Sequence, residues 1–203
     1  MRIRQHVNPN QLHFTRFRGE RPPLDGRLVE LEVGCADAQF LFERATVDPS
    51  RLYVGLEIRE DLTILVNKRA RSLGVPVHAV FCQAQLHVKE LFTAGSVERV
   101  YVNFPDPWFK RRHHERRMVD DALAEQIAHA LRPGGEVFVQ SDVWEIALDA
   151  MSTFDSDARF ENVAGEWTFW KQGNPYGVRS WREQNAEETG LPVWRIMYRR
   201  AMD

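Results

Sequence analysis

The chain has 203 residues, of which 43% are hydrophobic and 28% are charged, and it contains two cysteines. This length fits one domain with small additions, and the composition excludes a collagen-like, mostly disordered or disulfide-scaffold protein. The net charge of −2 argues against nucleic acid as a partner only if the charge is evenly spread, because a net charge averages over surfaces of opposite sign.

The chain is expected to be one domain preceded by a short arm. Residues 1–26 show no clear periodicity and are predicted to form a basic N-terminal arm, and residues 27–203 are predicted to form the domain. No stretch approaches the roughly 20 apolar residues that a membrane span needs, and the N-terminus lacks the apolar centre of a signal peptide. We therefore expect a cytoplasmic protein with no membrane contact.

From Arg27 onward, apolar runs of strand length alternate with segments of helical period. Strands are predicted over Leu28–Val33, Leu52–Ile58, Val75–Phe81, Val97–Phe104 and Glu136–Gln140. Helices are predicted over Gln39–Ala45, Asp61–Leu73, Val119–Leu131 and Trp144–Met151, with Gly74 expected as a left-handed helix cap. This alternation predicts an α/β domain with a mainly parallel sheet.

The C-terminal part of the chain has a different pattern. Shorter, aromatic-rich β runs are predicted over Phe160–Val163, Glu166–Trp170 and Val193–Tyr198. Their spacing favours an antiparallel hairpin that closes the sheet over another strand-helix-strand unit.

Two strand ends carry residues suited to a cofactor. In an open α/β sheet, ligands bind beyond the carboxyl ends of the strands, where the strand order reverses. Gly34 follows the first strand and permits a tight turn, and Glu57 ends the second strand 23 residues later. An acid at about this spacing accepts hydrogen bonds from both ribose hydroxyls. These two elements fit NAD and S-adenosylmethionine equally.

The end of the fourth strand separates those two cofactors. It reads Asn103-Phe104-Pro105-Asp106-Pro107-Trp108-Phe109-Lys110. The two prolines fix φ and remove two backbone donors, so we expect a rigid, extended turn. Asn103 and Asp106 on such a turn, beside an aromatic side chain, are suited to hold a flat heterocycle by its polar edge.

The positive charge is concentrated in two segments. Residues 1–27 carry a net charge of +4, and residues 110–117, here called the basic segment, carry another +4, which leaves −10 on the rest of the chain. Such asymmetry indicates a face that binds a polyanion. Phosphate contact is expected from Arg111, Arg112, Arg116 and Arg117 of the basic segment.

The stretch from Asn103 to Val119, NFPDPWFKRRHHERRMV, closely resembles the signature of the bacterial tRNA (guanine-N7-)-methyltransferase family. The resemblance implies a Rossmann-like class I methyltransferase fold with a seven-stranded sheet, S-adenosyl-L-methionine as the cofactor and tRNA as the partner. It further implies methylation of N7 of the guanosine at position 46 in the variable loop.

The resemblance also implies roles for individual residues. Glu32 and Gly34 fall on the first cofactor motif, Glu57 on the ribose-binding acid, and Asp106 on the aspartate near the transferred methyl, which makes Asp106 the catalytic candidate. With the turn and the third strand end included, the predicted cofactor-binding residues are Glu32, Gly34, Glu57, Gln83, Ala84, Asn103 and Asp106. The predicted substrate-binding residues are Lys110, Asp142, Ser180 and Glu183.

Four features depart from the family pattern. The turn Gly34-Cys35-Ala36-Asp37-Ala38 has fewer glycines than is usual in the family. Phe109 replaces a proline, Ser180 replaces a threonine, and Gln83 lies near the place of the acid that faces the adenine. A glutamine carbonyl also accepts a hydrogen bond from an adenine amine, so we expect cofactor binding.

The chemistry of such a reaction explains the residue types. Guanine N7 carries an in-plane lone pair, so its attack on a sulfonium methyl needs no base, and orientation alone can supply about 7–11 kcal/mol. Asp106 would stabilise the positive charge that develops on the purine. Asp142 and Glu183 would accept hydrogen bonds from guanine N1–H and the exocyclic amine. No metal is expected, because the adjacent His113 and His114 cannot easily share one tetrahedral site.

Two alternatives remain open. Asn103-Phe104-Pro105-Asp106 loosely resembles the turn of enzymes that methylate exocyclic amines of nucleic-acid bases. The second alternative is a catalytically weak RNA-binding homologue that has kept the sheet and the basic segment. The sequence leaves open whether the protein is a monomer or a homodimer.

Overall fold

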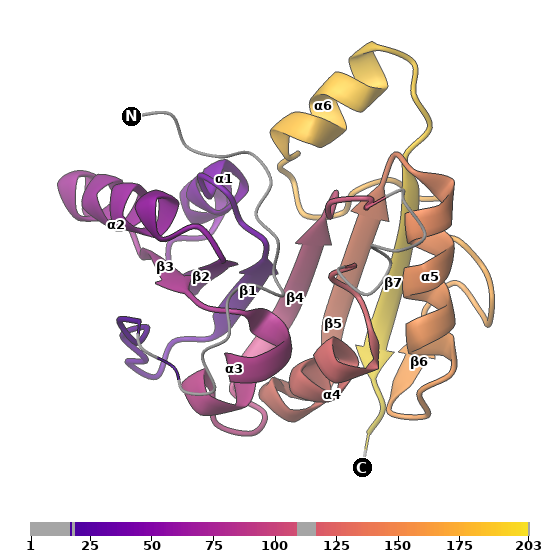
Figure 1. The fold of residues 1–203 in the computed structure, drawn as a ribbon, viewed down its shortest axis with the longest axis horizontal. Helices are drawn as coiled ribbons and strands as arrows, with labels where there is room; N and C mark the ends of the chain where they lie inside the picture. The colour runs from indigo at the N-terminus through magenta and orange to yellow at the C-terminus, as the bar shows by residue number, and fades with distance from the viewer. Residues whose placement is uncertain (1–16, 18, 109–116, 203) are drawn as a thin grey trace.

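A computed structural model describes residues 17, 19–108 and 117–202 of the chain (Figure 1). Within these residues the strands are β1 (Val29–Val33), β2 (Leu52–Glu57), β3 (Val77–Phe81), β4 (Val97–Asn103), β5 (Leu131–Ser141), β6 (Phe160–Asn162) and β7 (Trp194–Arg200). The helices are α1 (Gln39–Val47), α2 (Glu60–Leu73), α3 (Ala84–Leu91), α4 (Asp121–Ala130), α5 (Trp144–Asp155) and α6 (Trp181–Glu188).

The strands form one mixed sheet in the order β3-β2-β1-β4-β5-β7-β6. Neighbours among β1 to β5 pair in parallel, whereas β7 is antiparallel to both β5 and β6. This confirms the predicted α/β class and the mainly parallel seven-stranded sheet. The strand order reverses between β1 and β4, so a ligand site is expected beyond the carboxyl ends of these two strands.

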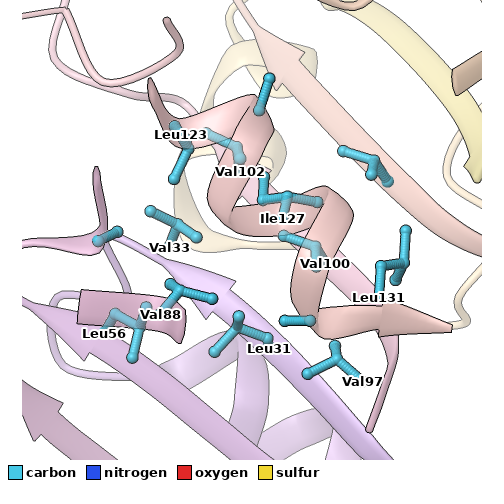
Figure 2. Close-up of a cluster of buried hydrophobic side chains, with 14 of the residues drawn as sticks. Leu31, Val33, Leu56, Val88, Val97, Val100, Val102, Leu123, Ile127 and Leu131 are labelled. Atoms are coloured by element: carbon cyan, nitrogen blue, oxygen red, sulfur yellow. The ribbon is translucent and has the colours of Figure 1, made fainter. Parts of the chain in front are cut away.

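Helices cover both faces of the sheet, and side chains on both faces of β1 are accordingly buried. Val29, Leu31 and Val33 pack into the core under α3, α4 and α5, and Figure 2 shows Leu31 and Val33 beside Val88 of α3 and Leu123 of α4. The opposite face packs against α1 and α2 in a second core. Glu30 and Glu32 alternate with the apolar residues of β1 and are also buried.

Glu30 lies in a buried ionic network that links β1 to α1 and β4. Both of its carboxylate oxygens accept hydrogen bonds from Arg44, at 2.9 and 3.0 Å. Arg99 Nη1 donates to Oε1 at 2.9 Å, and the hydroxyl of Tyr101 donates to Oε2 at 2.8 Å. Because every oxygen has donors of opposite charge or a hydroxyl, this buried acid is fully compensated.

Helix ends follow the chemistry of the sequence. Gly74 caps α2 with φ of 63°, which confirms the predicted left-handed cap. Asp120 precedes α4 and its carboxylate accepts a 2.8 Å hydrogen bond from the amide of Leu123. This cap places the start of α4 two residues later than the predicted helix at Val119.

Four features of the fold differ from the prediction. Helix α3 was not predicted because its apolar stripe is interrupted by His87, which is nonetheless buried. Helix α6 was not predicted because only Glu183 and Ala186 on it are buried, so it has no apolar stripe. Residues 166–170 form no strand, and β5 begins at Leu131 and runs through the Pro-Gly-Gly segment that was expected to precede it.

The predicted C-terminal hairpin is an antiparallel pair with a long connection. Asn162 of β6 pairs with Tyr198 of β7, but residues 163–193, including α6, lie between the two strands in sequence. Trp170 makes one backbone hydrogen bond, 2.8 Å long, to Arg195 of β7, and its neighbours 166–169 make no ladder. None of the helices in the described part of the chain is long and apolar enough to cross a membrane.

Candidate functional site

The carboxyl ends of β1 and β4 meet at the point where the strand order reverses. Glu32 pairs with Tyr101 across the two strands, and Asn103 lies two residues further along β4 on the same face. The side-chain amide of Asn103 donates a 2.8 Å hydrogen bond to Oε1 of Glu32. The structure thus brings together two residues that lie 71 positions apart in sequence.

Of the two buried acids on β1, Glu32 has fewer hydrogen-bond donors around its carboxylate than Glu30. Its side chain is 4% exposed, and its second oxygen, Oε2, has no hydrogen-bond partner. Burial raises the pKa of Glu32 to about 8 against the lowering effect of its hydrogen bond from Asn103. An acceptor that is buried and unpaired at a strand end indicates a place for a cationic donor group of a ligand.

Glu32 makes the free energy of unfolding depend on pH. Its pKa in the folded protein is about 8 and its ordinary value is 4.5. Its stabilising contribution is therefore complete below pH 4.5 and is lost as the pH rises through about 8. Glu32→Gln should remove this dependence, so the variant gains on the order of 3–5 kcal/mol over the unsubstituted protein between pH 5 and pH 9. Urea unfolding across that range measures the difference, and parallel curves would contradict it.

The turn after β1 is built around unusual backbone angles. Gly34 has φ of 78°, and a Cβ placed on it would lie 2.7 Å from Cε of Met118. Ala36 and Ala38 adopt φ of 50° and 55°, a region that residues with a side chain rarely occupy. Strain of this kind persists where the surrounding structure enforces it, and it concentrates at ligand sites.

Glu57 lies beside this turn at the end of β2. Its side chain is 3% exposed, and its Oε2 accepts a 2.9 Å hydrogen bond from the amide of Ala36. The amide of Ile58 donates to Oε1 at 2.9 Å, and Arg59 binds both oxygens through its guanidinium. The predicted ribose acid is therefore located next to the glycine turn, with its carboxylate held in place.

The turn after β4 is also strained. Phe104 and Trp108 have φ of 49° and 40°, and they flank the two prolines and Asp106. Asp106 lines a narrow crevice together with Pro105 and Met118. The expected rigid turn is thus present at the carboxyl edge, on the strand adjacent to Glu32.

The third strand end supplies the remaining predicted cofactor residues. Gln83 is the residue that precedes α3, and Ala84 is the first residue of that helix. Both follow β3, which neighbours β2, so they lie at the same edge of the sheet as Glu57.

A chain of hydrogen bonds runs from Asn103 across the sheet to α6. Gln140 Nε2 donates to Asn103 Oδ1 at 2.9 Å and to Glu183 Oε2 at 3.0 Å. Glu183 also accepts hydrogen bonds from Asn174, at 2.8 Å, and from Arg195, at 2.7 Å. The chain joins the carboxyl end of β4 to α6, which carries the predicted substrate-binding residue Glu183.

Glu183 occupies a different environment from the one that substrate contact requires. Its side chain is 0% exposed and its oxygens are satisfied by three protein side chains. Ser180 caps α6 by accepting a 3.2 Å hydrogen bond from the Glu183 amide. These contacts favour a positioning role for Glu183, with Ser180 as a helix cap.

The other residues predicted to bind substrate or RNA have different outcomes in the structure. The carboxylate of Asp142 accepts a 2.6 Å hydrogen bond from the exposed Arg182 of α6. Arg117 is 11% exposed and pairs with Asp149 and, at 3.9 Å, with Glu145 of α5, so its contacts favour an anchoring role over phosphate contact. Lys110, Arg111, Arg112 and Arg116 lie outside the described residues.

Several residues hold the predicted site residues in place, and the sequence did not predict these contacts. Gln140, Asn174 and Arg195 hold Glu183, and Arg59 holds Glu57. The pattern Ser180-x-x-Glu183 is a helix-start signal and could have revealed α6. No comparable local signal marks Gln140 or Asn174, because their partners lie on other elements.

Comparisons with known proteins identify the family. The family model described as "Putative methyltransferase" matches residues 26–196. The chain is 36% identical over 215 residues to a tRNA (guanine-N(7)-)-methyltransferase of Trichormus variabilis, covering 98% of this chain and 96% of that protein. It is 37% identical over 207 residues to the protein of the same name from Synechococcus elongatus, covering 98% and 96%.

A solved structure supports the fold. The geranyl diphosphate C-methyltransferase of Streptomyces coelicolor superposes with a TM-score of 0.56 at 13% identity, covering 87% of this chain and 76% of that one. The chain aligns over 98% of its length with each of the two relatives, and it has a glycine turn after β1 and a proline turn after β4. The chain belongs to the tRNA (guanine-N(7)-)-methyltransferase family.

Proposed function

We propose that the protein transfers a methyl group from S-adenosyl-L-methionine to N7 of the guanosine at position 46 in the variable loop of tRNA. The names of its relatives support a tRNA guanine-N7 reaction. The observation that carries the proposal is the buried Glu32, with one oxygen bound by Asn103 and the other unpaired, beside the strained turn that holds Asp106.

The residues at the carboxyl edge fit this cofactor. Glu32 Oε2 would accept from the α-ammonium group, the turn at Gly34 gives close access to the backbone, and Glu57 would bind the ribose hydroxyls. Gln83 and Ala84 would contact the adenine. When bound, the cofactor supplies an electrophilic methyl group on a positively charged sulfur.

Asp106 is the residue proposed to act on the base. Guanine N7 needs no deprotonation, so the protein must orient the base and stabilise the positive charge that it gains. Asp106 is held on a turn between two prolines, which limits the number of positions its carboxylate can take. Asp142 at the end of β5 is the second acid proposed to contact guanine, and Glu183 would keep α6 in place beside it.

The test uses unmodified tRNA and S-adenosylmethionine with a labelled methyl group, followed by borohydride and aniline treatment. N7-methylguanosine is cleaved by this treatment, so we expect label incorporation together with strand cleavage at position 46. Incorporation without cleavage would instead support an amino methyltransferase. Isothermal titration that detects no cofactor binding below millimolar concentration would support the RNA-binding homologue.

The basic segment is proposed to contact tRNA phosphates. Changing Arg111, Arg112 and Arg116 together to Ala should weaken tRNA binding and reduce the slope of log K against log salt by about 2 to 3, because each phosphate contact releases counterions. Filter binding from 50 to 300 mM salt measures the slope. Arg117→Ala is the comparison, since Arg117 pairs with Asp149, and it should change the slope by less than one. An unchanged slope in the triple variant would contradict the assignment.

Three further statements complete the proposal. Residues 1–26 are proposed as a basic arm that adds RNA contact to a domain of residues 27–203, although residues 1–16 and 18 of the arm lie outside the described residues. A cytoplasmic location is part of the proposal, because the proposed substrate is tRNA. The proposed reaction requires no metal, because the nucleophile is a lone pair already present on the base.

A further inference from the structure

The carboxylate of Glu57 is saturated with donors from its own chain. Three backbone amides bind it, those of Ala36 at 2.9 Å, Ile58 at 2.9 Å and Arg59 at 3.0 Å. Two further bonds come from the guanidinium of Arg59, Nε to Oε1 and Nη2 to Oε2, each 2.8 Å long. A carboxylate offers about four lone-pair positions, so five donors leave no place for another.

Local helix energetics do not explain an arginine at this position. Arg59 is the residue that precedes α2, and its side chain makes no cap hydrogen bond. A positive charge is unfavourable at a helix N-terminus, where acidic residues such as Glu60 and Asp61 are favoured. The contacts with Glu57 therefore help to account for the position of this guanidinium, whose side chain is 21% exposed.

The backbone amides and the guanidinium differ in how easily they can leave. The amides of Ala36 and Ile58 are fixed by the turn after β1 and the end of β2. The guanidinium lies at the end of a flexible side chain and binds the two oxygens as a fork. A ribose diol also presents two donors to the two oxygens of one acid, so it requires the positions that Arg59 occupies.

We infer that Arg59 is an internal competitor of the cofactor ribose: its guanidinium binds Glu57 until the two ribose hydroxyls displace it. This inference rests on the proposed function, because it takes Glu57 as the ribose-binding acid. The competition weakens binding of every ligand that uses the diol, including both the methylated and the demethylated cofactor. Ligands without the diol are unaffected.

The displaced guanidinium keeps a counter-ion nearby. The pKa of Arg59 is raised chiefly by its hydrogen bonds with Glu57, and the negative charge of Asp106 raises it further. Asp106 therefore lies within electrostatic range of the guanidinium. The displaced guanidinium therefore stays near a negative charge, and its side chain is already 21% exposed to solvent, so the displacement requires no unfolding of the turn.

Isothermal titration with S-adenosylhomocysteine tests the inference, because this ligand has the ribose diol but no sulfonium charge that Arg59 would repel. Arg59→Met, which has similar length and no donor, should bind it about 10-fold more tightly, equivalent to about 1.4 kcal/mol. Arg59→Lys keeps the charge but loses the fork, and it should show a smaller gain. Arg71→Gln, an exposed arginine at the other end of α2, is the matched control and should bind as the unsubstituted protein does.

A pair of nucleosides that differ only in the ribose hydroxyls distinguishes an effect on diol binding from a general change in the affinity of the pocket. Arg59→Met should increase affinity for adenosine about 10-fold and change affinity for 2′,3′-dideoxyadenosine by less than twofold. Equal gains for both nucleosides, or unchanged or weaker binding of S-adenosylhomocysteine in both variants, would overturn the inference. Failure of the unsubstituted protein to bind S-adenosylhomocysteine would instead overturn the proposed function, so the two failures are distinguishable.

Discussion

Replacing Asp106 with alanine is expected to lower kcat by at least about 10²–10³-fold, the loss found when one preorganised electrostatic group is removed from an active site. Asp106 lies between two prolines on a turn whose flanking residues, Phe104 and Trp108, have positive φ. Because the turn restricts the backbone that carries this carboxylate, freely moving water is a poor substitute for it. Single-turnover methylation of unmodified tRNA at saturating cofactor measures the effect.

The controls separate catalysis from binding and folding. Asp106→Ala should leave the Kd for tRNA within about threefold of the original value, since RNA affinity comes mostly from phosphate contacts. Asp61→Ala, which removes an exposed acid from the first turn of α2, should leave kcat unchanged. Near-normal turnover by the Asp106 variant would remove this residue from the proposed role.

Replacing Glu30 with alanine is expected to lower the free energy of unfolding by about 3–5 kcal/mol, because removal of one partner from a buried ion pair leaves the other charge uncompensated. Arg44 has a side-chain exposure of 5% and donates two hydrogen bonds to Glu30. Arg99 and the hydroxyl of Tyr101 lose a partner at the same time. Urea denaturation at pH 7 measures the loss.

A substitution of the same kind two residues away provides the contrast. Glu32→Gln removes a buried acid that has one partner, and it is expected to stabilise the protein at pH 8, whereas Glu30→Gln should destabilise it. The two side chains lie on the same face of one strand and are both buried, so burial alone cannot explain why one substitution raises the free energy of unfolding and the other lowers it. Equal losses in both variants would contradict the division between a structural and a ligand-binding acid.

A chain of hydrogen bonds connects Glu32 on β1 to Glu183 on α6. Asn103 bonds to Glu32, and Gln140 bonds to both Asn103 and Glu183. Gln140 is fully buried, so its amide is held by these partners and not by water. The orientation of α6 is thereby tied to the same strand ends that are proposed to bind the cofactor.

Much of the fold could be predicted because the sheet is regular. The alternation Val29-Glu30-Leu31-Glu32-Val33 places the apolar residues on one face, and that is where α3, α4 and α5 pack. Gly74 ended α2 as expected. Helix α6 was missed for the converse reason, since a helix held by one buried acid and its partners has no hydrophobic period.

The candidate site was predictable where its chemistry is local. The strained turns around Gly34 and Asp106 are encoded by glycine and proline in short stretches, so their positions at strand ends could be read from the sequence. Contacts between distant segments could not. The position of Glu183 in the interior depends on Gln140, Asn174 and Arg195, which come from β5, a loop and β7.

By itself, the sequence determined the α/β class, the strand ends and the two turns that bear the proposed functional residues. Only the tertiary structure decided that Glu30 is neutralised by arginines while Glu32 keeps an unpaired oxygen, and that Arg59 covers Glu57. The spacing of apolar residues along a strand or helix indicates which face each residue occupies, because apolar side chains are favoured in the core and polar side chains in solvent. The partner of a buried charge depends on strand order and register, which bring together residues far apart in the chain.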